Sequence, residues 1–136
     1  MFDWGTLIDL AEKLADPSDE ARSRAAVSRA YYGAFNLSKR YLQRELSVTT
    51  VPDTGAAHHV VWKDMEARGK ALRRVGITGS RLKKARWQVD YDDSITRLAD
   101  VVTTALGDAK NIRRLLQEER AAKAIAVAVP KLPGSG

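Results

Sequence analysis

Hydrophobic residues recur at three- and four-residue intervals along most of the chain, which is the spacing of one face of an α-helix. The pattern predicts helices over about residues 4–15, 17–46, 56–74, 81–89 and 92–124. No stretch of the sequence sustains the two-residue alternation of a half-buried strand. The sequence therefore predicts an all-α fold, an up-and-down bundle of four to five helices.

Turn-forming residues separate these helices. Asp16 can cap the second helix, with Pro17 at its first position. The two glycines of VGITGS, residues 75–80, predict a break after the third helix, and Ser80 can cap the fourth. Asp92 or Asp93 can cap the last helix.

The length of 136 residues fits one domain. Residues 125–136 lose the helical periodicity and end in proline, glycine and serine. We therefore expect residues 1–124 to form a single helical-bundle domain, followed by a poorly ordered C-terminal tail.

The second helix combines a broad apolar arc with polar residues at the edge of that arc. The arc is wider than one protomer is expected to cover, which predicts a homodimer. Arg24 and Ser28 lie at its edge beside Tyr31, and Arg86 interrupts the apolar stripe of the fourth helix. A buried arginine needs an acid or a path to water, so we expect Arg24 to share a polar network with the acids that follow Arg86.

The composition removes several classes of chemistry. The chain has no cysteine, which excludes disulfides, thiolate metal sites and cysteine nucleophiles, and fits a reducing compartment. The N-terminal segment is acidic where a signal peptide is basic, and no apolar run is long enough to cross a bilayer. We expect a cytoplasmic protein with no membrane contact, no metal site and no cofactor.

The positive charge is concentrated in one part of the sequence. Residues 63–86 hold nine bases and two acids, a net charge of +7, whereas the whole chain carries +6. A basic patch of this kind indicates binding to the phosphates of RNA or of a nucleotide. The alternative is a solvated helix face on a bundle that only dimerises and acts as a scaffold.

Three segments together resemble the HEPN domains, which are small prokaryotic helical-bundle proteins. They are RAAVSRAYYGAF, HHVVWKDM and RWQVDYDDS, and the resemblance spans about residues 5–120. It implies a bundle of four or five helices that is usually a homodimer. It also implies a toxin–antitoxin or defence module, often with a nucleotidyltransferase-type partner, and in many members metal-independent ribonuclease activity.

The chain departs from the usual active motif of that family, an arginine followed about four to six residues later by a histidine. Asp90 and Tyr91 occupy the place after Arg86 where the histidine is expected. His58 lies on an apolar stripe, so it is either a packed core residue or a substitute for the missing histidine. The candidate catalytic residues are therefore Arg86, Asp90, Tyr91 and His58.

The first hypothesis is an RNA- or nucleotide-binding protein with a nucleotidyltransferase-type or other defence partner. The candidate residues for that binding are the arginines and lysines of the patch and the polar residues beside Tyr31: Arg24, Ser28, Arg29, Tyr32, Arg73, Arg74, Lys83 and Lys84. The second hypothesis is a ribonuclease toxin with a non-standard motif, and the third is the structural scaffold.

Overall fold

The structure is a computed structural model that describes residues 1–128, and these residues form a bundle of five helices. The helices are α1 (Gly5–Leu14), α2 (Glu20–Glu45), α3 (Ala56–Ala67), α4 (Lys70–Tyr91) and α5 (Leu98–Ala128). The described residues contain no strand. The predicted all-α bundle is therefore confirmed.

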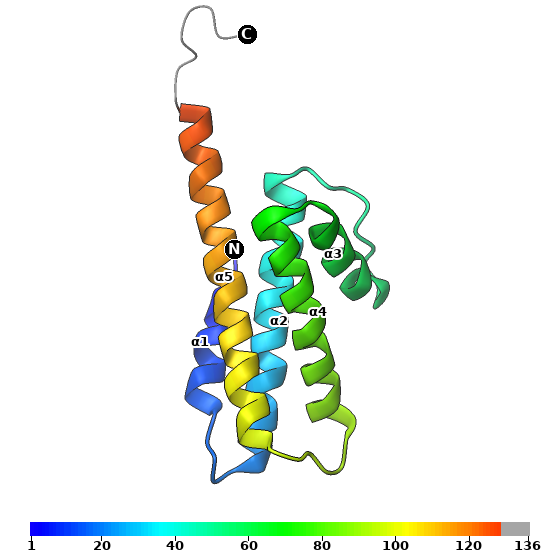
Figure 1. Ribbon diagram of the computed structural model, residues 1–136, viewed down its shortest axis with the longest axis vertical. Coiled ribbons are helices and arrows are strands. Elements are labelled where there is room, and N and C mark those ends of the chain that lie inside the picture. Colours follow the sequence, from blue (N-terminus) through cyan, green and yellow to red (C-terminus); the bar gives the residue numbers. More distant parts are fainter. Residues whose placement is uncertain (129–136) are drawn as a thin grey trace, which may run out of the picture.

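The helices α2, α4 and α5 run side by side, the shorter α1 packs along part of α2 and α5, and α3 lies against one end of α4 (Figure 1). The central helix is α2, because it contacts all four of the others. α5 extends past the end of the bundle. This arrangement places one face of α2 against both α3 and α4, where the candidate site lies.

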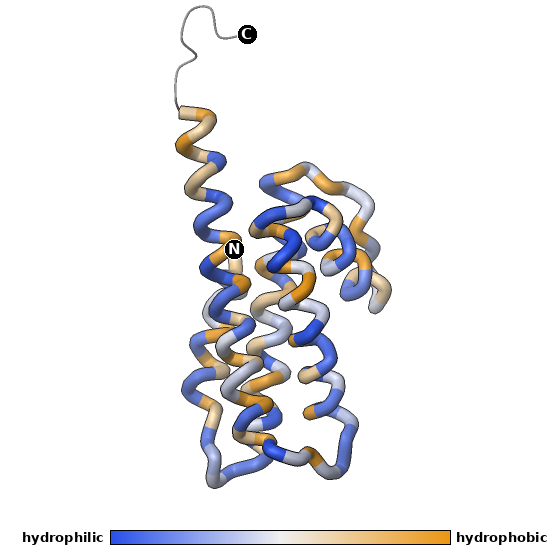
Figure 2. The backbone as a smooth tube through the Cα atoms, viewed as in Figure 1, coloured by the Kyte–Doolittle hydropathy of each residue, from blue (hydrophilic) through white to orange (hydrophobic). Residues whose placement is uncertain are grey.

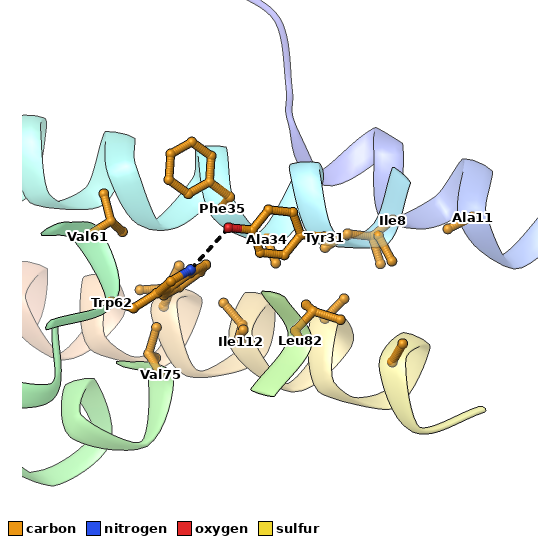
Figure 3. Packing of buried hydrophobic residues seen from close by; sticks show 14 of the residues in the cluster. Ile8, Ala11, Tyr31, Ala34, Phe35, Val61, Trp62, Val75, Leu82 and Ile112 are labelled. Atoms are coloured by element: carbon orange, nitrogen blue, oxygen red, sulfur yellow. Dashed lines mark hydrogen bonds between the residues drawn. The ribbon is translucent and has the colours of Figure 1, made fainter. Parts of the chain in front are cut away.

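The core is built around the apolar arc of α2. Tyr31, Tyr41 and Leu42 from this helix are almost fully buried, and Trp62 of α3 and Ile112 of α5 pack in the same cluster. Figure 3 shows these two flanking helices meeting the α2 side chains. The arc is covered within one chain, so its width no longer argues for a homodimer, and the homodimer stays a prediction.

The start of α2 differs from the prediction. Asp19, not Asp16, is the N-cap, and its side chain accepts a hydrogen bond from the backbone N–H of Arg22 at 3.0 Å. Asp16 instead accepts from the backbone N–H of Ser18 at 2.9 Å, within the preceding turn. Pro17 lies in that turn rather than in the helix.

The predicted break at residues 75–80 is wrong, because α4 is continuous through Gly76, Gly79 and Ser80. The chain turns earlier, at Gly69, whose φ of 79° lies in the left-handed region that favours glycine. A Cβ on Gly79 would lie 2.1 Å from Cε3 of Trp62, and a Cβ on Gly76 would lie 2.5 Å from the backbone oxygen of Trp62. The two glycines therefore allow α3 to pack closely on α4.

The boundary between α4 and α5 also lies elsewhere than predicted. α4 continues to Tyr91, and α5 begins at Leu98 rather than near Asp92. At its other end α5 runs to Ala128, four residues beyond the expected limit of the domain. The rest of the predicted tail lies outside the described residues.

Hydrophobic and hydrophilic segments alternate along every helix, as one-sided burial requires (Figure 2). Among residues 1–128, no helix combines the length and the apolar character needed to cross a membrane.

Candidate functional site

Side chains from three helices meet where α3 and α4 cover α2. They are Tyr31, Tyr32 and Phe35 of α2, His58 of α3 and Arg86 of α4, and we call them the His58–Arg86 cluster. Tyr31 is fully buried, whereas Tyr32, His58 and Arg86 are partly exposed. The cluster therefore has a buried floor and an accessible edge.

Hydrogen bonds and ring stacking fix the orientation of His58. Its Nδ1 lies 2.6 Å from the hydroxyl of Tyr31, and its ring stacks on Phe35 with a centroid distance of 4.1 Å. The same hydroxyl accepts a hydrogen bond from Nε1 of Trp62 at 3.2 Å, which Figure 3 shows as a dashed line. His58 and Trp62 are four residues apart on α3, so both reach Tyr31 from one helix face.

Arg86 is a largely buried cation with few partners. Its side chain is 13% exposed, and its guanidinium carbon lies 5.4 Å from the ring centroid of Tyr31 and 5.8 Å from that of Tyr32. Its Nη1 is 3.5 Å from a carboxylate oxygen of Asp90, the limit of a hydrogen bond. Its Nε is buried without a hydrogen-bond partner among the described residues.

Positive charge converges on His58. Burial lowers the pKa of this residue, and Arg86, Lys83 and Lys39 lower it further. The ring is therefore neutral at pH 7. Burial also raises the pKa of Tyr31 to about 12, so the phenol stays protonated. The site combines a neutral imidazole with three cations that Asp90 balances only in part.

Arg24 has a different environment, at the C-terminal end of α4. Its guanidinium donates to the backbone oxygens of Val89, Asp92 and Asp93 at 2.9, 2.6 and 3.2 Å, and to the carboxylate of Glu20 at 3.1 Å. The predicted network between Arg24 and this segment exists, but it uses main-chain oxygens rather than the carboxylates of the segment. The carbonyls at the end of α4 are thereby satisfied.

The other candidate residues divide between the cluster and the outer surface. Lys83 and Tyr32 lie at the cluster, Asp90 joins it through Arg86, and Ser28 is half-buried one helical turn before Tyr32. Arg29, Arg73 and Arg74 are exposed, and Tyr91 packs against Trp87 on the outer face of α4, with ring centroids 5.2 Å apart. The structure does not bring Tyr91 to His58.

Lys84 lines a second site, an open groove of about 500 Å³ between α4 and α5. The neighbouring Arg81 donates to both carboxylate oxygens of Asp108, at 2.9 and 2.6 Å. The paired donors of Arg81 are thus already used within the chain. Lys84 belongs to this groove and not to the His58–Arg86 cluster.

Sequence reasoning missed three members of the arrangement. Trp62, Phe35 and Lys39 were not among the candidate residues. The spacing of four residues between His58 and Trp62, and again between Phe35 and Lys39, was the available signal. It shows which residues share a helix face but not which faces meet.

The described residues contain no group of three or more histidine, aspartate and glutamate side chains that could hold a metal ion. The fold and the cluster define an all-α bundle with a cationic and aromatic site between three helices. Comparisons with protein-family models, with curated proteins and with solved structures found no match.

Proposed function

We propose that the chain is an RNA-binding protein of the HEPN type and that it binds a backbone phosphate at the His58–Arg86 cluster. The observation that carries the proposal is the state of Arg86. This guanidinium is largely buried, its Nε is unpaired among the described residues, and its one carboxylate contact is long. The buried Nε is out of reach of a ligand, but the Nη groups make only this long contact among the described residues, so they can donate to a bound anion that offsets the cost of burying the cation.

The surroundings of Arg86 favour an anion with an aromatic or sugar component. Lys83 and Lys39 add positive charge near His58, and the partly exposed ring of Tyr32 lies beside the guanidinium, where an aromatic base can contact it. A phosphate oxygen could accept from Arg86 in the bidentate geometry that guanidinium groups favour. The concentration of bases in residues 63–86 extends the positive surface along α4.

Fluorescence anisotropy with a labelled single-stranded RNA tests the proposal. We expect binding that weakens steeply with added salt and that falls about tenfold or more in Arg86→Gln, since a charge-assisted hydrogen bond contributes about 1.5–3 kcal/mol. The matched control is Arg114→Gln, which removes an exposed arginine on α5 that pairs with Glu118. Equal affinity in wild type and Arg86→Gln, or no binding at low salt, would contradict the proposal.

A second candidate function is a metal-independent ribonuclease. The observation that favours it is the position of His58 beside Arg86, because a histidine and an arginine are the residue types that the resemblance implies for cleavage. Cleavage of RNA in EDTA that disappears in Arg86→Gln and in His58→Gln would support this function. The absence of cleavage together with retained binding would support the first proposal.

The toxin–antitoxin or defence module, the nucleotidyltransferase-type partner and the homodimer complete the proposal, and they rest on the resemblance. Light scattering on the purified chain tests the homodimer. Co-expression with a nucleotidyltransferase encoded next to this chain, followed by co-purification, tests the partner.

A further inference from the structure

Three side chains form a continuous hydrogen-bonded line beneath the candidate site. Nε1 of Trp62 lies 3.2 Å from the hydroxyl of Tyr31, and that hydroxyl lies 2.6 Å from Nδ1 of His58. Trp62 is 1% exposed and Tyr31 is fully buried, so these two groups are sealed inside the core. His58 is the end of the line that reaches the accessible edge of the site.

The chemistry of these groups, together with the burial of the Tyr31 hydroxyl, assigns a direction to each hydrogen bond. An indole N–H can only donate, so the oxygen of Tyr31 accepts from Trp62. The phenol oxygen can accept a second hydrogen bond, but if it accepted one from Nδ1–H of His58, its own hydrogen would be buried without an acceptor among the described residues. The phenol hydrogen therefore goes to Nδ1 of His58, which accepts it. A neutral imidazole carries one hydrogen, so a histidine whose Nδ1 accepts has its hydrogen on Nε2.

We propose that Trp62 and Tyr31 are positioning residues that hold His58 as an Nε2–H donor, and that His58 accordingly binds a phosphate oxygen and does not act as a general base. The lone pair of the ring is on Nδ1, where Tyr31 occupies it. Nε2 has no lone pair with which to take a proton from a ribose 2′-hydroxyl, so His58 cannot serve there as the general base. This inference rests on the proposed RNA binding for its ligand.

The groups that face His58 from the neighbouring helices fit the same ligand. Lys39 of α2 and Lys83 and Arg86 of α4 lie close enough to lower the pKa of His58, and each of them can only donate hydrogen bonds. A ligand group that satisfies these three cations and an Nε2–H must offer several acceptors. A phosphate with two non-bridging oxygens meets this need, whereas a hydroxyl or an exocyclic amine does not.

Nitrogen NMR of the intact chain tests whether Trp62 and Tyr31 hold His58 as the Nε2–H tautomer. In protein with ¹⁵N-labelled histidine and the substitution His59→Gln, His58 is the single remaining histidine. At pH 7.5 we expect the long-range proton–nitrogen spectrum of the Nε2–H tautomer, and a mixture of the two tautomers in Tyr31→Phe, which keeps the ring but loses the hydroxyl. A spectrum of the Nδ1–H tautomer, or of an equal mixture, in the His59→Gln protein with Tyr31 intact would overturn the inference.

Binding and cleavage assays separate this inference from the proposed function. We expect Tyr31→Phe to weaken RNA binding about threefold to tenfold, because the donor is no longer held in place. His58→Gln, whose amide can still donate, should retain more affinity than His58→Leu. If the protein binds RNA but His58 is the Nδ1–H tautomer, the proposed function stands and the positioning role of Tyr31 and Trp62 is overturned. If His58 is the Nε2–H tautomer but the protein does not bind RNA, the positioning role stands and the proposed function is overturned. If the protein cleaves RNA in EDTA and His58→Gln abolishes the cleavage, the donor role of His58 is overturned.

Discussion

Arg24 and Arg86 occupy similar places in the sequence pattern, at apolar stripes of α2 and α4, yet the structure uses them in opposite ways. Arg24 makes hydrogen bonds to three backbone oxygens and one carboxylate. Arg86 has one long carboxylate contact, two aromatic neighbours and an unpaired Nε among the described residues. The first arginine is satisfied by its own chain, and the second has donors left for a ligand.

The difference shows how to separate a structural arginine from a binding one. The chain places Arg24 at the end of α4, where carbonyls need donors, and it stabilises the turn into α5. It places Arg86 over aromatic rings, which attract a cation but leave its N–H groups with no acceptor except the distant carboxylate of Asp90. Substitutions at the two positions should therefore divide between stability and binding.

The largest effect is expected from a substitution that displaces α3, the helix that carries His58 to Arg86. In Gly79→Ala the new Cβ would meet the ring of Trp62, so we expect a loss of about 3 kcal/mol or more in the free energy of unfolding, and weaker RNA binding as His58 moves away from Arg86. Urea denaturation measures the first effect. Gly107→Ala is the matched control, because no atom beyond the neighbouring backbone of its own helix lies within 4 Å of that Cβ, and it should raise stability by about 1 kcal/mol.

Removal of Arg24 should reduce stability without a direct effect on binding. Arg24→Ala leaves the backbone oxygens of Val89 and Asp92 without their donor, and we expect the free energy of unfolding to fall by about 2 kcal/mol. Arg24→Lys should recover only part of this loss, because one ammonium group cannot follow the planar fork of a guanidinium. A folded Arg24→Ala protein that no longer bound RNA would contradict the assignment of Arg24 to stability alone.

Removal of Arg86 should have the opposite result. In Arg86→Met the apolar side chain replaces a poorly compensated buried charge, so we expect the free energy of unfolding to stay the same or to rise by about 1 kcal/mol. RNA affinity should fall about tenfold or more in the same protein. Urea denaturation and anisotropy on one preparation measure both, and a clear loss of stability would mean that Arg86 is structural like Arg24.

The sequence predicted the fold well because helical periodicity records which residues are buried. The apolar arc of the second helix and a helix over about residues 92–124 were predicted, and α2 and α5 form the core with Trp62 of α3. The break at residues 75–80 was predicted wrongly, because two nearby glycines are typical both of a loop and of a close contact between helices, and here Gly76 and Gly79 make such a contact. Only the position of α3 distinguishes the two uses.

The candidate site was predicted in part. His58, Arg86, Tyr32 and Lys83 were all named as candidates, and the structure brings them together. The hydrogen bonds between Trp62, Tyr31 and His58 could not be predicted, because they depend on the distance between two helices. The partners of Arg24 were missed for another reason: main-chain oxygens have no signature in a sequence.

The smallest expected effect is the pH dependence that His58 gives to stability. The pKa of His58 is lowered in the folded protein, chiefly by burial, whereas an unfolded chain titrates near the ordinary value of about 6.5. The unfolded state therefore binds more protons as the pH falls below about 6.5, and stability is lost from there down to the lowered pKa. Urea denaturation from pH 7.5 to pH 5 should show this loss, and His58→Gln should reduce it. The control is His59→Gln, which replaces the exposed neighbour and should lose as much stability between pH 7.5 and pH 5 as the wild type. If stability fell with pH as steeply in His58→Gln as in the wild type, the pKa of His58 would be the same in the folded and unfolded chains. The neutral imidazole beside Arg86, which has no counterpart beside Arg24, would then not be supported.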